Sequence, residues 1–179
     1  MDNKYGEIRR LFKPTKLKAP QVFTAAIGMM LALHLIEPGA QLIIKPWVWL
    51  GGIPAGAGLL LTMWSVGVLE VHQTTSGLGV NTWADRMFKH YRTKDRSISD
   101  ITALVTVGPF GFSRHPMFLG MTLAVFGLAV VLGSATPMLV VVVFPLILDQ
   151  RYMGAEDAEL EGLFGEQWRT YAARVRRWI

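Results

Sequence analysis

The feature that most constrains this chain is the length of its uncharged apolar runs, which lie at residues 19–36, 46–69 and 117–148. Because a helix rises about 1.5 Å per residue, each of the first two runs can cross the roughly 30 Å hydrocarbon core of a bilayer. The third run would be about 48 Å long as one helix, and Gly133–Pro137 would divide it into a hairpin. We therefore expect an all-α integral membrane protein with four transmembrane helices, at about 19–36, 46–70, 117–133 and 136–151.

Composition agrees with a membrane location and excludes several other classes. Only 17% of the 179 residues are charged and 51% are hydrophobic, whereas soluble domains carry about 25% charged residues. The chain has no cysteine, which rules out disulfides and thiolate metal sites. The first 18 residues are too polar to begin a signal peptide. No internal repeat or linker divides the sequence, so residues 1–179 form one predicted domain.

The positive charges predict how the chain crosses the membrane. Of the 18 Lys and Arg residues, only Lys45 falls on the side of the membrane opposite to the termini in the four-helix arrangement. The positive-inside rule therefore places both termini and the central loop, residues 70–116, in the cytoplasm. The tight hairpin fits a prokaryotic inner membrane. The positive excess would face anionic lipid, and we expect no nucleic-acid partner.

Three segments are candidates for helices outside the bilayer. Residues 1–18 would form either an amphipathic surface helix or a frayed basic tail, and residues 82–91 a surface helix. Residues 152–178 would form one polar helix with an apolar stripe, which includes Leu163, Trp168 and Tyr171. Within the membrane, His34 is interpreted as a packing histidine or a proton relay. Small residues of the second run favour close helix packing over a ligand groove: Gly51, Gly52, Gly56, Ala57 and Gly58.

The segment LVTVGPFGFSRHPMFLG, residues 104–120, has the properties of a binding site. Gly108-Pro109 and His115-Pro116 indicate turns, and Pro116 is suited to be the first residue of the next helix. Arg114 and His115 would then lie at the positive end of that helix, where backbone N–H groups favour a carboxylate or another anionic group.

A second polar group follows the membrane hairpin, with Asp149, Arg151, Glu156 and Asp157 close together in the sequence. Acidic residues at a helix start often only complement the helix dipole. Ionisable groups at a membrane edge are nevertheless candidates for function.

These two blocks, 104–120 and AEDAELEGLFGEQWRTYAARV at 155–175, resemble the membrane methyltransferases of the isoprenylcysteine carboxyl methyltransferase and phospholipid methyltransferase superfamily. Their order and separation match, over about two-fifths of the chain. The resemblance implies S-adenosylmethionine as cofactor, no Rossmann fold and no metal. The cofactor would lie between residues 102–120 and 149–177, and a lipophilic acceptor would enter from the bilayer.

The resemblance also implies roles for single residues. Glu156 would bind the ammonium or amino-acid end of the cofactor, and His115 and Arg151 would be catalytic. Phe110 and Phe118 stand where the family often has tyrosine. The acceptor stays open between a phospholipid amine, a prenylcysteine carboxylate, a small thiol or another lipophile, and the base between His115, Asp157, Glu70 and His72. The full set of predicted cofactor-binding residues is Leu104, Val105, Phe110, Arg114, His115, Pro116, Phe118 and Glu156.

Two other functions compete with this interpretation. The segment GEQWRTY, residues 165–171, is also similar to a block of NADPH-dependent sterol and steroid reductases, although those enzymes are usually much larger. The second alternative is a non-enzymatic membrane scaffold whose basic face recruits anionic lipid. The cofactor that binds would distinguish a methyltransferase from a reductase. A scaffold would tolerate alanine at His115 and Glu156.

Overall fold

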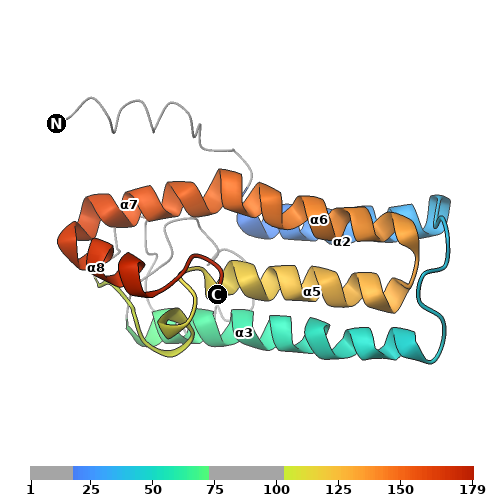
Figure 1. The fold of residues 1–179 in the computed structure, drawn as a ribbon, viewed down its shortest axis with the longest axis horizontal. Helices are drawn as coiled ribbons and strands as arrows, with labels where there is room; N and C mark the ends of the chain where they lie inside the picture. Colours follow the sequence, from blue (N-terminus) through green and yellow to red (C-terminus); the bar gives the residue numbers. More distant parts are fainter. Residues whose placement is uncertain (1–17, 73–102) are drawn as a thin grey trace, which may run out of the picture.

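The computed structural model describes residues 18–72 and 103–179, and it is built from helices that lie side by side (Figure 1). The predicted surface helices at 1–18 and 82–91 lie outside the described residues, apart from Lys18. In the described parts of the chain, the non-helical pairing is one isolated bridge between Gln41 and Ser134. The elements are α2 (Ala19–Ile36), η1 (Trp47–Gly51), α3 (Gly52–Val71), η4 (Gly108–Gly111), α5 (Pro116–Leu132), α6 (Ala135–Leu148), η5 (Asp149–Met153), α7 (Gly154–Phe164) and α8 (Glu166–Arg174).

Three helical stretches are long and apolar enough to cross a membrane: Ala19–Ile36, Trp47–Leu69 and Ala135–Phe164. The predicted first helix at 19–36 is confirmed. The predicted helix at 46–70 begins with the 3-10 turn η1, and its α-helical part starts at Gly52. Helix α5 is apolar but, with 17 residues, shorter than the other three. The hairpin is present, with α5 beginning at Pro116 as predicted and ending before Gly133, whose φ of 68° is left-handed.

Helices α3 and α5 approach each other so closely that glycine is required at their contact. A Cβ added to Gly58 would lie 2.4 Å from the carbonyl oxygen of Gly120, and one added to Gly127 would lie 2.3 Å from the amide nitrogen of Ala55. Gly51 and Gly58 therefore serve the close packing that the small-residue cluster predicted. Gly52 and Gly56 do not, because an added Cβ there would meet nothing within 4 Å.

The end of the bundle formed by the α5–α6 turn is closed by the loop that follows α2. The amide groups of Leu42 and Ile43 donate to the carbonyl oxygen of Gly133 at 2.8 and 3.0 Å. The ring nitrogen Nδ1 of His34 lies 2.7 Å from the hydroxyl of Ser134. His34 is thus a hydrogen-bonded packing residue, which is one of its two predicted interpretations.

The C-terminal region differs from the single helix predicted at 152–178. Helix α6 runs through a π-helical segment, η5, into α7, so these three form one continuous rod (Figure 1). The helix then breaks at Gly165, with φ 52° and ψ −116°, a conformation that strongly favours glycine. Helix α8 folds back, and this reversal buries Trp168 and Tyr171 while Leu163 stays 56% exposed. The apolar stripe is therefore not one continuous face.

Candidate active site

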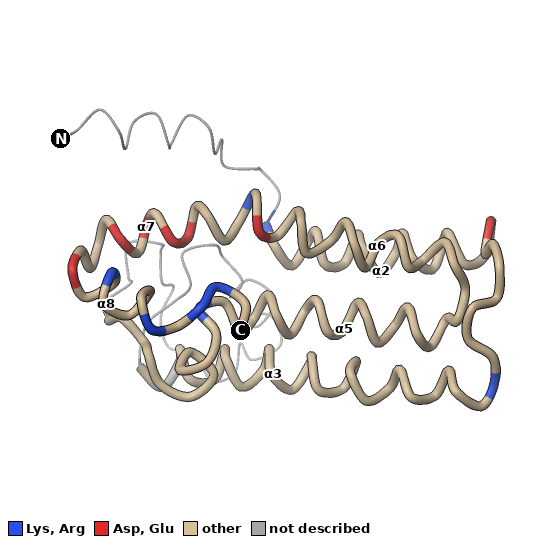
Figure 2. The backbone as a smooth tube through the Cα atoms, in the orientation of Figure 1, with Lys and Arg blue, Asp and Glu red and all other residues tan. Residues whose placement is uncertain are grey.

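The charged residues of the described chain gather at one end of the bundle. Figure 2 shows them on α7, α8 and the C-terminal segment, whereas α3 and α5 carry almost none along their length. At the opposite end, Glu37 follows α2 and Lys45 precedes η1. The polar chemistry of the described residues is thus concentrated where the loop before α5 meets α7 and α8.

The loop before α5 is held by contacts on two sides. On one side, Gly108 takes a left-handed φ of 62°, and a Cβ added there would lie 3.3 Å from the side chain of Val68 on α3. On the other side, the hydroxyl of Tyr171 on α8 donates to the carbonyl oxygen of Phe110 at 2.7 Å. Pro109 and Phe110 are buried between these contacts. The loop therefore delivers its last residue, His115, to a fixed position.

His115 precedes the first turn of α5, and its side chain lies between two carboxylates of α7. Its ring nitrogen Nδ1 is 3.1 Å from Glu156 Oε2, and Nε2 is 2.9 Å from Asp157 Oδ1. The residue is only 3% exposed, and its ring stacks on Phe118 with 5.7 Å between centroids. Because both nitrogens face acceptors, the ring fits best as an imidazolium that donates from each of them.

The surroundings of His115 favour this charged form. Burial by itself lowers the pKa of the imidazole, but hydrogen bonds to Asp157 and Glu156 and the charges of both carboxylates outweigh it. The pKa of His115 is raised from 6.5 to about 9. At neutral pH the ring is therefore protonated and cannot accept a proton while it stays between the carboxylates.

The two carboxylates reach one ring although they are consecutive in sequence. Glu156 and Asp157 lie in the first turn of α7, directly after η5. Such π-helical turns insert one extra residue into a helix, rotate the helix beyond that point and are frequent at functional sites. Glu156 is 8% exposed and contacts Nδ1 of His115, while Asp157 contacts Nε2 of the same ring.

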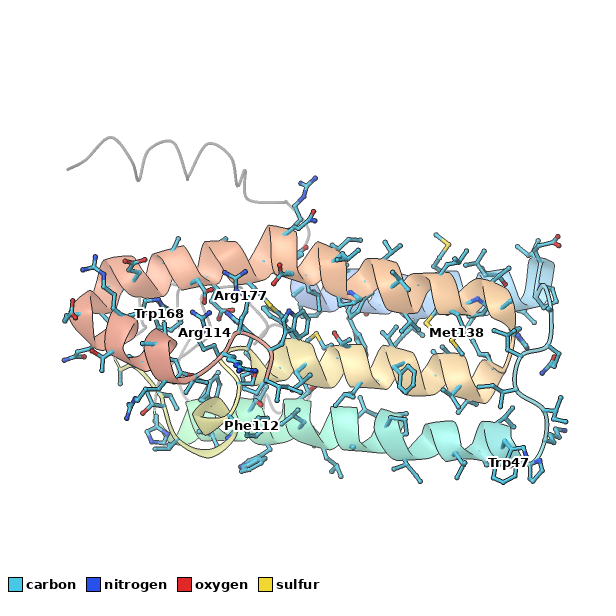
Figure 3. The ribbon with its side chains drawn as sticks, in the orientation of Figure 1. Trp47, Phe112, Arg114, Met138, Trp168 and Arg177 are labelled. Carbon is cyan, nitrogen blue, oxygen red and sulfur yellow. The ribbon has the colours of Figure 1, made fainter. Side chains whose placement is uncertain are left out.

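Two arginines complete the cluster (Figure 3). Arg114 Nη1 lies 3.6 Å from Asp157 Oδ2, and its guanidinium carbon is 5.7 Å from the ring centroid of Trp168. The Nε atom of Arg114 is buried and has no hydrogen-bond partner in the part of the chain that the structure describes. Arg177 donates to Asp157 Oδ2 from Nε at 3.0 Å, and its Nη1 lies 3.4 Å from Asp149 Oδ1.

The predicted site residues do not all meet. Arg114, His115, Phe118 and Glu156 come together as expected. The other predicted residues, except Arg151, are buried or half-buried. The side chain of Arg151 is exposed and forms no hydrogen bond or ion pair with the described cluster. Its catalytic role stays a prediction. The buried residues among these others are Val105, Phe110 and Pro116, and Leu104 is half-buried.

Two residues that contact this site were not predicted from the sequence: Arg177, and Ser113, whose hydroxyl accepts the backbone N–H of His115 at 3.2 Å. Arg177 belongs to the run of cations at the C-terminus, Arg174, Arg176 and Arg177, and nothing local distinguishes it from its neighbours. Of the predicted bases, His72 is exposed and its Nδ1 lies 2.8 Å from the carbonyl oxygen of Val68, within its own helix end. The side chain of Glu70 lies outside the described part of the structure.

Fold and site together define an all-helical membrane protein whose polar centre lies at one end of its apolar helices. The profile of the phospholipid methyltransferase family matches residues 46–167, which is more than half of the chain. The chain belongs to this family of membrane methyltransferases, and the resemblance stated above is confirmed. The chain is also 33% identical over 63 residues to an uncharacterised protein of Haemophilus influenzae; the match covers 35% of this chain and 100% of that protein. No solved structure matches.

Proposed function

We propose that this protein transfers a methyl group from S-adenosylmethionine to a lipophilic acceptor at the cytoplasmic face of a prokaryotic inner membrane. The observation that carries the proposal is the contact of His115 with Glu156 and Asp157. These residues come from the two blocks that resemble the superfamily, and they are 41 and 42 positions apart. The family match, over residues 46–167, also supports methyl transfer.

The described residues fit such a ligand. The amino-acid end of S-adenosylmethionine carries an ammonium and a carboxylate, and its sulfonium carries a positive charge. Glu156 and Asp157 supply anions for the ammonium, and the buried Nε of Arg114 is a donor without a partner that a carboxylate would satisfy. The rings of Phe118 and Trp168 already lie against cationic groups of the site, with His115 stacked on Phe118 and the guanidinium of Arg114 over Trp168. When bound, the cofactor supplies an electrophilic methyl group.

The protein's own contribution to this reaction is positioning and exclusion of water. The loop before α5 and helix α7 would hold S-adenosylmethionine, the methyl donor, and the acceptor would reach it from the bilayer. The family match favours a phospholipid amine as acceptor. Arg151, exposed and five residues before Glu156, would contact an anionic group of such a lipid.

The membrane arrangement that we propose has four spans: the three long apolar stretches and, in addition, the shorter helix α5. Its 17 residues correspond to about 26 Å, and it packs along α3 through the glycine contacts. The site then shares the cytoplasmic face with the lysine- and arginine-rich segments.

The direct test is calorimetric binding of S-adenosylhomocysteine to the detergent-purified protein, with NADPH measured in parallel. We expect saturable binding by the wild type, weakened at least about tenfold in His115→Ala and Glu156→Gln. Glu166→Gln is the matched control, because Glu166 is exposed and pairs only with Arg169 among the ion pairs found. Incubation with methyl-labelled S-adenosylmethionine and membrane lipids would then identify the acceptor.

Each alternative function has its own result in this experiment. NADPH binding without adenosyl binding would assign the protein to reductase chemistry. Binding of neither compound, with His115→Ala and Glu156→Gln as stable as the wild type, would indicate a scaffold.

A further inference from the structure

The five residues after α8, 175–179, lie against the loop that precedes His115. The backbone amide of Arg114 donates to the carbonyl oxygen of Arg176 at 3.0 Å. The fully buried hydroxyl of Ser113 donates to the carbonyl oxygen of Arg177 at 3.4 Å and accepts the backbone N–H of His115 at 3.2 Å. The C-terminal segment is thus tied to both residues that precede His115 in the sequence.

The side chain of Arg177 extends from this segment to the acidic side of the site (Figure 3). Its Nε and Nη2 lie 3.0 and 2.9 Å from Asp157 Oδ2, and its Nη1 lies 3.4 Å from Asp149 Oδ1. The other oxygen of Asp157 accepts from His115. One planar guanidinium therefore holds one oxygen of the carboxylate whose second oxygen binds the histidine.

We infer that Arg177 is a positioning residue of this site, which orients Asp157 toward His115 and thereby makes the C-terminal segment part of the active centre. Its importance for catalysis rests on the proposed function. The orientation of Asp157 does not, because it follows from the contacts alone. Arg176 is the matched control, since its side chain is exposed and its contribution to the loop is a backbone carbonyl that a substitution retains.

Electrostatics separates positioning from a simple charge effect. The groups that face His115 are the carboxylates of Glu156 and Asp157 on α7, with Asp149 behind them on η5. Three further groups lie around these carboxylates: the guanidinium of Arg114 from the loop, the guanidinium of Arg177 from the C-terminal segment and the phenol of Tyr171 from α8. If Arg177 acted only through its charge, its removal would leave this region more negative and would raise the pKa of His115. If Arg177 positions Asp157, its removal takes away the two shortest contacts of Asp157 Oδ2 and leaves the longer one, at 3.6 Å from Arg114. The carboxylate then turns away from His115, which lowers the pKa of His115.

The experiment is a pH titration of ¹⁵N-histidine-labelled protein in detergent, followed by NMR, with His115→Gln used to assign the signal. Wild type should titrate near pH 9. We expect Arg177→Gln to lower that value by at least about one pH unit, and Arg176→Gln to leave it unchanged. A value that is unchanged or raised in Arg177→Gln overturns the inference.

Arg177→Lys keeps the test decisive if Arg177→Gln does not fold. Lysine retains the charge but lacks the planar fork, so a pure charge effect predicts no change, whereas positioning predicts a lower pKa of His115. Calorimetric binding of S-adenosylhomocysteine is the second readout, and we expect it to weaken at least about tenfold in Arg177→Gln and not in Arg176→Gln. If wild type binds no S-adenosylhomocysteine, the proposed function fails, while the titration still decides whether Arg177 positions Asp157.

Discussion

At the scale of single residues, His115 differs from its prediction in the origin of the anionic groups that it contacts. The sequence placed Arg114 and His115 at a helix N-terminus and predicted an anionic ligand group there. In the structure the anions that His115 contacts are the protein's own Glu156 and Asp157. A cationic ligand that binds these carboxylates would therefore compete with the imidazolium for them.

The raised pKa of His115 predicts a pH-dependent stability. Because the folded protein holds the proton more tightly than the unfolded chain, the histidine stabilises the fold fully below pH 6.5. That contribution is lost as the pH rises toward about 9. We expect the melting temperature in detergent to fall across this range, with about 3 kcal/mol as the upper limit of the loss.

His115→Gln should flatten this decline, because glutamine does not titrate. His72→Gln is the control, since His72 is exposed and its replacement should leave the wild-type decline in place. A wild-type melting temperature that is constant from pH 6.5 to 9 would contradict the assignment of the proton to His115.

At the scale of elements, the contact of α3 with α5 positions the site. Helix α5 carries His115 at its start, and its glycines allow its backbone to touch that of α3. In a lipid environment such contacts depend on van der Waals packing, because lipid surrounds both helices before and after they associate.

Gly127→Ala should therefore destabilise the protein by about 1–3 kcal/mol, since its methyl group would have to displace backbone atoms of α3. Gly56→Ala should be neutral or slightly stabilising, because its Cβ would meet nothing within 4 Å. Thermal unfolding in detergent compares the two. Equal effects of both substitutions would be inconsistent with a close α3–α5 contact.

The break between α7 and α8 depends on Gly165 in the same direct way. Gly165→Ala forces a side chain into a left-handed backbone and should cost about 1–3 kcal/mol. Gly162→Ala, within α7 and with open space around it, should stabilise the protein by up to about 1 kcal/mol. If Gly165→Ala were as stable as wild type, the chain would not need the sharp reversal at this position.

At the scale of the whole molecule, the two ends of the bundle differ in chemistry. One end carries the charged cluster, and the other is closed by backbone hydrogen bonds between the α5–α6 turn and the loop after α2 (Figures 1 and 2). Such an asymmetric distribution of charge is typical of a protein with a fixed orientation in its membrane.

The absence of cysteine allows the orientation to be measured with single-cysteine variants and a membrane-impermeant maleimide. We expect Gln167→Cys, at an exposed position of α8, to react only in inverted vesicles. Leu42→Cys, 58% exposed at the opposite end, should react from the outside. Three helices (α3, α5 and α6) separate these positions, so labelling from the same side would show that one of the three, or all three, do not cross the membrane.

The features that local chemistry controls could be predicted from the sequence alone. Long apolar runs specify membrane helices, Pro116 begins α5, and Gly133 permits the turn to α6. The order and spacing of the two polar blocks indicated the family, and they pointed to His115 and Glu156, whose side chains lie 3.1 Å apart in the structure. The helices and turns depend on hydropathy and on backbone dihedral preferences, which act over a few residues and can be read along the chain, whereas the family followed from the resemblance of two motifs.

The three-dimensional arrangement was needed to show which distant groups meet. The reversal at Gly165 brings the C-terminus back to the loop before α5, and with it Arg177, 20 residues beyond the carboxylate that it holds. The glycines of α5 became recognisable as packing residues only beside those of α3. An ion pair or a helix contact depends on distance in space, and that distance is set by how all the helices pack together, not by any local sequence pattern.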